Sequence, residues 1–215
     1  YSVTVEDDKG CPATANFPLT QPDPIVISPT TVNLACNGIS TGSIDVAVSG
    51  GVGPYTYMWN NNGGTSATRT GLAAGTYGVT VKDNNNCTKT ASYTLTQPSA
   101  LSLTKTVSNV SCNGGSDGNI DLSVAGGVAP YSINWSNNAN TEDINNLPTG
   151  TYSVNVTDVN GCQKSTTVIV SEPAILAATG THTNATCNGG TNGSIDLIVS
   201  GGTMPYNYNW GTGAP

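Results

Sequence analysis

The sequence has few charged residues and little of what catalysis or nucleic-acid binding requires. Charged side chains make up 9% of the 215 residues, Lys and Arg number 6, and the net charge is −7. So few basic residues cannot form a phosphate-binding face, which excludes nucleic acid as a partner. His182 is the only histidine and there is no CxxC pair, so neither a nucleophile–base pair nor a zinc site is expected. We therefore predict no enzyme activity.

Long apolar runs are also missing, so no transmembrane segment is expected in this stretch. Gly, Asn, Thr and Ser are abundant instead, and short alternating runs of Val, Ile, Leu, Tyr and Trp separate them. Thr, Val and Tyr favour strands, while Gly and Asn supply turns. The composition predicts an all-β protein.

A motif that returns about every 75 residues dominates the sequence. Cys36-Asn37-Gly38 is repeated from Cys112 and again from Cys187. The predicted segments are a C-terminal part of a repeat at 1–22 (repeat 1), complete repeats at 23–98 (repeat 2) and 99–173 (repeat 3), and an N-terminal part at 174–215 (repeat 4). Because both ends fall in mid-repeat, we expect a piece of a longer polypeptide.

Alternating apolar residues within each repeat indicate short half-buried strands. In repeat 2, Ile44 begins one such run and Trp59 ends another that carries Tyr55 and Tyr57. Six or seven strands per repeat predict tandem immunoglobulin-like (PKD-like) β-sandwiches. The linkers, such as Gln97-Pro98, are short and proline restricts them to extended conformations, which favours an extended rod.

Aromatic residues at fixed places in the repeat are expected to form its structural core. A Tyr that follows a Leu and a Gly resembles the tyrosine corner of such sandwiches, and the Trp on the third strand should lie between the sheets. A sugar-stacking surface is the less favoured alternative for these rings. The predicted core residues are Trp59, Trp135, Trp210, Tyr77 and Tyr152.

The six cysteines are disulfide candidates because a thin core benefits from covalent links. One set lies in the first turn of a repeat and the other at the start of its last strand. The sets are Cys36, Cys112 and Cys187, and Cys11, Cys87 and Cys162. Two pairings remain open: within repeats, as Cys36–Cys87 and Cys112–Cys162, or across a junction, as Cys36–Cys162.

Recurring aspartates allow two interpretations. Asp45, Asp121 and Asp196 follow the first turn, whereas Asp8, Asp83 and Asp158 recur at the last hairpin. Such residues usually bind nearby backbone groups in turns. Oxygen ligands can also hold Ca²⁺, so Asp45, Asp83, Asp121, Asp158 and Asp196 are weaker calcium candidates. No other cofactor is expected.

Taken together, the motifs resemble the SprB repeat of very large cell-surface adhesins of gliding Bacteroidota. The resemblance is carried by Cys-Asn-Gly-Gly, Gly-Gly-x-x-Pro-Tyr-x-x-x-Trp and Leu-x-x-Gly-Thr-Tyr, followed by Asp-x-x-Gly-Cys and Gln-Pro. It implies secretion through outer-membrane machinery and an extracellular, cell-surface location. It also implies attachment to surface polysaccharides or other surfaces, and contact with the motility machinery.

Two functions agree with these features. The first is the repetitive stalk of an adhesin filament that supports attachment and gliding motility. The alternative is a structural filament or sheath whose repeats bind other copies of the chain laterally. An enzyme with sandwich modules would need a catalytic domain outside this sequence.

Overall fold

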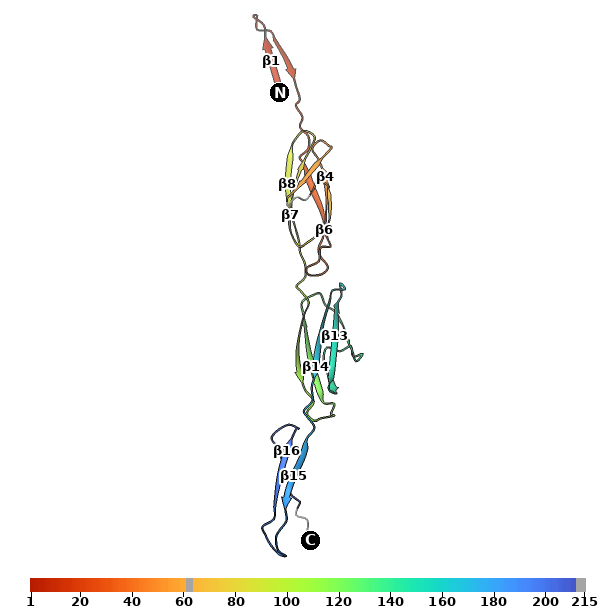
Figure 1. Cartoon of the computed structure of the whole chain (residues 1–215). Coiled ribbons are helices and arrows are strands. Elements are labelled where there is room, and N and C mark those ends of the chain that lie inside the picture. The colour runs from red at the N-terminus through yellow and green to blue at the C-terminus, as the bar shows by residue number, and fades with distance from the viewer. Residues whose placement is uncertain (61–63, 212–215) are drawn as a thin grey trace. The chain divides into compact units, whose positions relative to one another are not determined.

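A computed structural model of the protein describes residues 1–60 and 64–211. Within these ranges the regular structure consists of sixteen strands and no helix, which confirms the all-β prediction. The chain divides into two compact units, Tyr1–Gln97 and Pro98–Pro215, and each is described by itself (Figure 1).

Repeat 2 is a sandwich of two three-stranded antiparallel sheets, with the strand orders β3-β4-β6 and β5-β7-β8. Its strands are β3 (Val26–Val32), β4 (Gly42–Ser49), β5 (Thr56–Trp59), β6 (Thr68–Leu72), β7 (Gly75–Lys82) and β8 (Thr88–Leu95). Ile44 of β4 packs in one buried cluster with Trp59 of β5 and Val81 of β7. Both sheets thus contribute to one core, as the alternating pattern predicts.

Repeat 3 has the same architecture, with the strand orders β12-β10-β9 and β11-β13-β14. Its strands are β9 (Ser102–Ser108), β10 (Gly118–Ala125), β11 (Tyr131–Trp135), β12 (Ile144–Leu147), β13 (Gly150–Asp158) and β14 (Gln163–Val170). Ile120, Trp135 and Val156 take the core places of Ile44, Trp59 and Val81. The two complete repeats therefore confirm tandem β-sandwiches.

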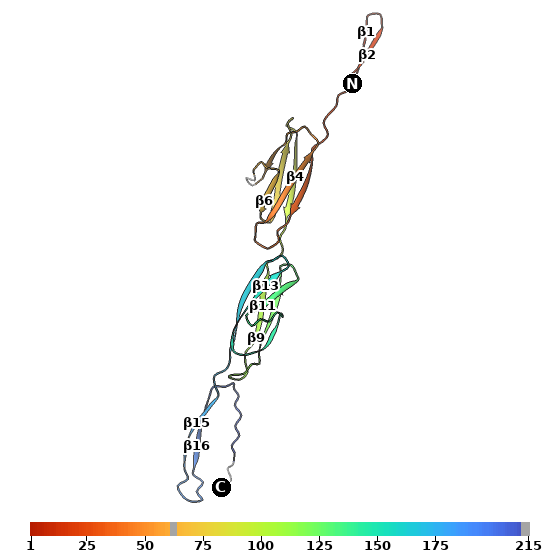
Figure 2. The ribbon, with the colours of Figure 1, turned by 90° about the vertical axis from the view of Figure 1, so that its right-hand side faces the viewer.

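Repeats 1 and 4 each contribute one hairpin. Repeat 1 forms β1 (Ser2–Glu6) and β2 (Pro12–Asn16), and repeat 4 forms β15 (Ala177–Thr183) and β16 (Ser194–Ser200), as labelled in Figure 2. Val3 pairs with Ala15 as Val79 of β7 pairs with Ala91 of β8. The residues of β1 and β2 are all exposed, because a lone two-stranded ribbon has no second layer to cover it.

The tyrosine corner is present in both complete repeats. The Tyr77 hydroxyl donates to the Ala73 carbonyl at 2.9 Å, and the Tyr152 hydroxyl donates to the Pro148 carbonyl at 3.0 Å. The bond ties the start of β7 or β13 to the preceding turn. The immunoglobulin-like prediction for this segment is therefore confirmed.

A buried residue and an exposed residue of repeat 2 provide a test of this core. Replacing Ile44, which is 0% exposed, by Ala should lower the free energy of unfolding by about 2–5 kcal/mol, because it leaves a cavity between the sheets. Met58→Ala is the control: Met58 is 67% exposed, so its loss should cost no more than about 0.5 kcal/mol. Urea unfolding measures both, and equal losses would contradict the assigned core.

Candidate functional site

The described residues hold no cluster of three or more His, Cys, Asp or Glu side chains that could bind a metal ion. His182 lies exposed on β15 opposite Ile195 of β16. The recurring polar groups that bind the backbone of their own repeat lie instead at the two ends of each sandwich. We call the end where the chain begins the repeat its leading end, and the end where the chain leaves it the trailing end.

A buried aspartate organises the leading end. Asp83 is 3% exposed and lies in the turn between β7 and β8. Its Oδ1 accepts from the backbone N–H groups of Asn85 at 2.9 Å and Cys87 at 2.8 Å. Its Oδ2 accepts from the Val52 N–H at 3.0 Å, in the loop between β4 and β5. One side chain thus joins two turns that are 31 residues apart in sequence.

Asp158 makes the equivalent bonds in repeat 3. Its Oδ1 accepts from Asn160 and Cys162, both at 2.9 Å, and its Oδ2 accepts from Val128 at 2.9 Å. In repeat 1 the matching bonds, from Lys9 and Cys11 at 2.9 Å, go to Asp7. The sequence-based choice of Asp8 for this place was therefore wrong by one residue, because two adjacent aspartates made the alignment of the turn ambiguous.

These hydrogen bonds set the ionisation of the turn aspartates. Burial raises the pKa of the Asp83 carboxyl, but the N–H groups of Val52, Cys87 and Asn85 favour its charged form and together outweigh burial. The net pKa of Asp83 lies below the ordinary aspartate value. The pKa of Asp158 is lowered by the same balance of burial and backbone donors.

A pair of glycines in the loop between β4 and β5 lets this loop lie close to the backbone that precedes β3. Gly50 has φ +70°, and a Cβ placed on it would lie 2.0 Å from the Pro24 carbonyl oxygen. The next residue, Gly51, donates its N–H to the Asp23 carbonyl at 2.7 Å. Gly126 and Gly201 repeat the close approach, to Ala100 and Ile175. Any side chain here would push the first strand away from the leading end.

The trailing end is closed by the first turn of the repeat. In repeat 2 the Leu34 N–H donates to the Thr96 carbonyl at 3.0 Å, and the Gly38 N–H donates to Gln97 Oε1 at 2.8 Å. In repeat 3 the Gly114 N–H donates to Glu172 Oε2 at 2.7 Å. The Cys-Asn-Gly turn therefore lies beside the residues that lead out of the repeat.

Sequence reasoning missed the roles of Gln97 and Glu172, which it treated only as part of the linkers. It also missed Asn33 and Asn109, whose Oδ1 atoms accept from the Thr96 and Ser171 N–H groups at 2.9 and 3.0 Å. The available signal was recurrence, because an Asn and a Gln/Glu-Pro pair stand at matching places in both complete repeats.

The aromatic residues lie where the core prediction placed them in the complete repeats. Trp59 and Trp135 are buried, and their indole N–H groups donate to the carbonyls of Ser66 at 2.8 Å and Thr141 at 3.0 Å. The Arg69 guanidinium stacks on Trp59 and Tyr77, with its central carbon 5.5 and 5.2 Å from the ring centroids. These rings pack inward and present no stacking platform for a sugar.

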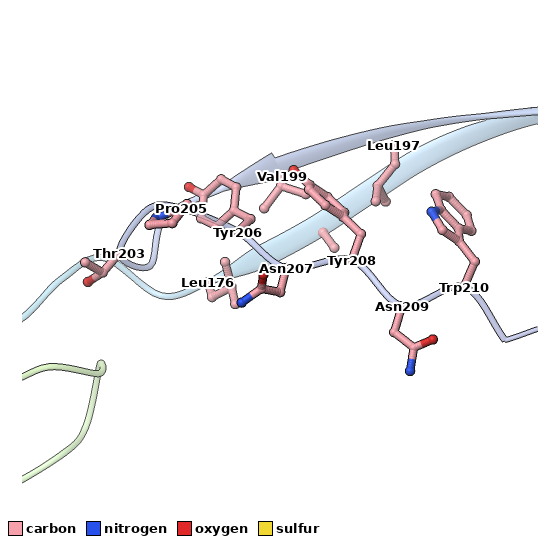
Figure 3. A pocket seen from close by; sticks show the side chains of 11 residues that line it. Leu176, Leu197, Val199, Thr203, Pro205, Tyr206, Asn207, Tyr208, Asn209 and Trp210 are labelled. Atoms are coloured by element: carbon pink, nitrogen blue, oxygen red, sulfur yellow. The ribbon is translucent and has the colours of Figure 1, made fainter.

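Trp210 differs from the other two tryptophans, because it is 58% exposed. Figure 3 shows Tyr206, Tyr208 and Trp210 on the side that faces Leu197 and Val199 of β16. They line an open pocket of about 400 Å³. Residues 174–211 contain no equivalent of β7 and β8 to close the second sheet over them, so the core position predicted for Trp210 is not buried.

The calcium candidates fall into two groups. Asp83 and Asp158 direct their oxygens at backbone N–H groups, as described above. Asp45, Asp121 and Asp196 lie on exposed positions of β4, β10 and β16, and Asp45 accepts from the Thr68 hydroxyl. The structure does not bring the two groups together within a repeat, and calcium binding stays a prediction.

The cysteines differ in state. Cys36 and Cys162 are disulfide-bonded, whereas Cys11, Cys87, Cys112 and Cys187 are exposed free thiols. The within-repeat pairs Cys36–Cys87 and Cys112–Cys162 are therefore not formed. Cys36 lies in the turn between Leu34 and Gly38, which bind Thr96 and Gln97 after the end of β8, whereas Cys87 precedes the start of β8. Eight strand residues span about 26 Å, while a disulfide needs Cα atoms within about 7 Å.

The fold and its ends define a class of protein: tandem β-sandwich modules in which the recurring polar residues at the two ends bind the backbone of their own repeat. The family model of the SprB repeat matches residues 28–64, 104–140 and 179–215, which together make up just over half of the chain. The chain therefore belongs to the SprB repeat family, as the motifs indicate. SprB repeats are structural repeats of cell-surface adhesins and not an enzyme family.

A search of curated proteins finds no match to the chain. Among the described residues there is no helix that is both long and apolar enough to cross a membrane.

The buried aspartate makes the stability of repeat 2 depend on pH. Because the pKa of folded Asp83 lies below its ordinary value, its stabilisation should be present at neutral pH and be lost below about pH 4, as the carboxylate is protonated. Asp83→Asn should melt several degrees lower at pH 7, because the amide nitrogen cannot accept from the Val52 N–H. It should also lose less stability in acid than the wild type.

Asp121→Asn is the matched control, because Asp121 is exposed on the outer face of β10. Thermal melting followed by circular dichroism between about pH 2 and 7 measures all three proteins. Equal acid dependence of wild type and Asp83→Asn would show that Asp83 does not link stability to pH.

Proposed function

We propose that the chain is part of the repetitive stalk of an extracellular adhesin filament, displayed at the cell surface, that supports attachment to surfaces and gliding motility. Its partners are surface polysaccharides or other surfaces, and the secretion and motility machinery of the outer membrane. The membership in the SprB repeat family supports the stalk.

One observation carries this proposal: the polar residues that recur at the two ends of the complete repeats are used within their own repeat. The carboxylates of Asp83 and Asp158 bind turns, and the side chains of Gln97 and Glu172 bind the trailing end. Residues that recur for a shared ligand would have to leave donors or acceptors turned outward. Polar residues that recur because they bind the backbone of their own repeat are instead typical of a module whose role is that of a spacer.

A spacer can still support attachment. Many weak contacts along a long array add up to high avidity, with no deep pocket in any one repeat. The outward faces of the sandwiches are rich in Thr, Ser and Asn, for example Thr90 and Asn155. Such hydroxyl and amide groups suit weak, repeated hydrogen bonding to a hydrated surface.

The proposal is tested on living source cells with beads that carry an antibody against repeat 2. Beads that travel along the cell would support a motility adhesin, because the antigen must then move with the motor. Beads coated with an antibody against an unrelated outer-membrane protein are the control. Antigen that is exposed but stationary on gliding cells would overturn the motility part of the proposal.

The sheath alternative makes a different prediction for the purified chain. Lateral binding between copies would make its sedimentation coefficient rise with concentration under reducing conditions. A stalk predicts monomers over the same range, because the repeats then bind other surfaces and not each other. Sedimentation velocity distinguishes the two.

A further inference from the structure

Two polar side chains take the place of apolar core residues in repeat 2. Arg69 pairs with β4 at the place where Ile144 pairs with β10 in repeat 3. Tyr93 pairs with β7 at the place where Val168 pairs with β13. Ile144 and Val168 both belong to the buried cluster of repeat 3. The same sandwich is thus built with apolar side chains at these places, so the fold alone does not require Arg69 and Tyr93.

The two replacements lie in one cluster inside repeat 2. The central carbon of the Arg69 guanidinium lies 5.2 Å from the centroid of the Tyr77 ring and 5.5 Å from that of Trp59. Tyr93 packs against the same core and lies directly opposite Tyr77 on the neighbouring strand. Residues paired in this way have Cβ atoms about 5 Å apart. Arg69 and Tyr93 are therefore both neighbours of Tyr77.

Each of these side chains has a buried donor that the protein does not pair. Arg69 Nη1 and Tyr93 Oη are shielded from solvent, and no atom of residues 1–60 and 64–211 forms a hydrogen bond with either. A buried donor without a partner costs stability, and a charged one costs more. Burial raises the pKa of the Tyr93 hydroxyl, which therefore keeps its proton at neutral pH. Two such donors in one cluster indicate a shared acceptor.

We propose that Arg69 and Tyr93 bind a small inorganic anion of the halide class in the core of repeat 2. The guanidinium supplies a positive charge and an N–H donor, and the phenol supplies an O–H donor. An anion is favoured over water, because a buried charge needs a counter-charge as well as hydrogen bonds. A halide is favoured over sulfate or phosphate, because both donors are shielded from solvent and a small monovalent ion loses its water at lower cost.

The site makes the stability of repeat 2 depend on halide concentration. A ligand that binds only the folded state stabilises it in proportion to the logarithm of its concentration, once that concentration exceeds the dissociation constant. Repeat 3 has Ile144 and Val168 at the two places, so it lacks both donors and its stability should not respond. One chain thus contains both the site and its internal control. The site goes beyond the proposed function, because neither attachment nor gliding requires it.

Hydrogen exchange of the full chain, followed by mass spectrometry, tests the site with chloride as the probe. Sodium chloride replaces sodium gluconate at constant ionic strength, because gluconate is too large to enter the core. Above the dissociation constant, each tenfold rise in chloride should slow the exchange of the β4 and β7 amides about tenfold. The amides of β10 and β13 in repeat 3 should exchange at the same rate in both salts.

Variants assign the effect to the two side chains. The double variant Arg69→Ile/Tyr93→Val carries the residues of repeat 3 and should lose the response to chloride. Tyr93→Phe keeps the ring and the charge of Arg69, so it should still respond but need more chloride for the same slowing.

Three results would overturn the site: equal exchange of repeat 2 in chloride and gluconate, equal slowing of repeats 2 and 3, or a response that survives in the double variant. The first would assign the two donors to internal water. None of these measurements involves adhesion or gliding, so the halide site and the proposed function can fail separately.

Discussion

The fold depends on closing a two-layer sandwich with only six strands per repeat. The core between the sheets is thin, and its ends are open unless turns cover them. The buried carboxylates of Asp83 and Asp158 close the leading ends by joining the hairpin turn to the glycine loop. Gln97 and Glu172 close the trailing ends. Apolar burial stabilises the layers, and a few side-chain bonds to the backbone position both turns that carry cysteine.

Much of this fold is predictable from the sequence, because alternation and recurrence are local signals. Their spacing alone predicts Ile44 and Trp59 in the core and Tyr77 at the corner, and they lie there in the structure. The sheet pairing follows from the sandwich class. Side chains whose partners are distant in sequence were not predictable. Asp83 reaches Val52, and Asn33 reaches Thr96, 63 residues away.

The two complete repeats also differ at positions that lie outside their shared motif. Ile44 pairs with Arg69 on β6, whereas the equivalent Ile120 pairs with Ile144 on β12. Ile144 is part of the core of repeat 3, and Arg69 instead lies over the rings of Trp59 and Tyr77. The stem of an arginine can cover apolar surface while its head binds aromatic faces. The sequence around Arg69 is polar and unpatterned, so no periodic signal could reveal this replacement.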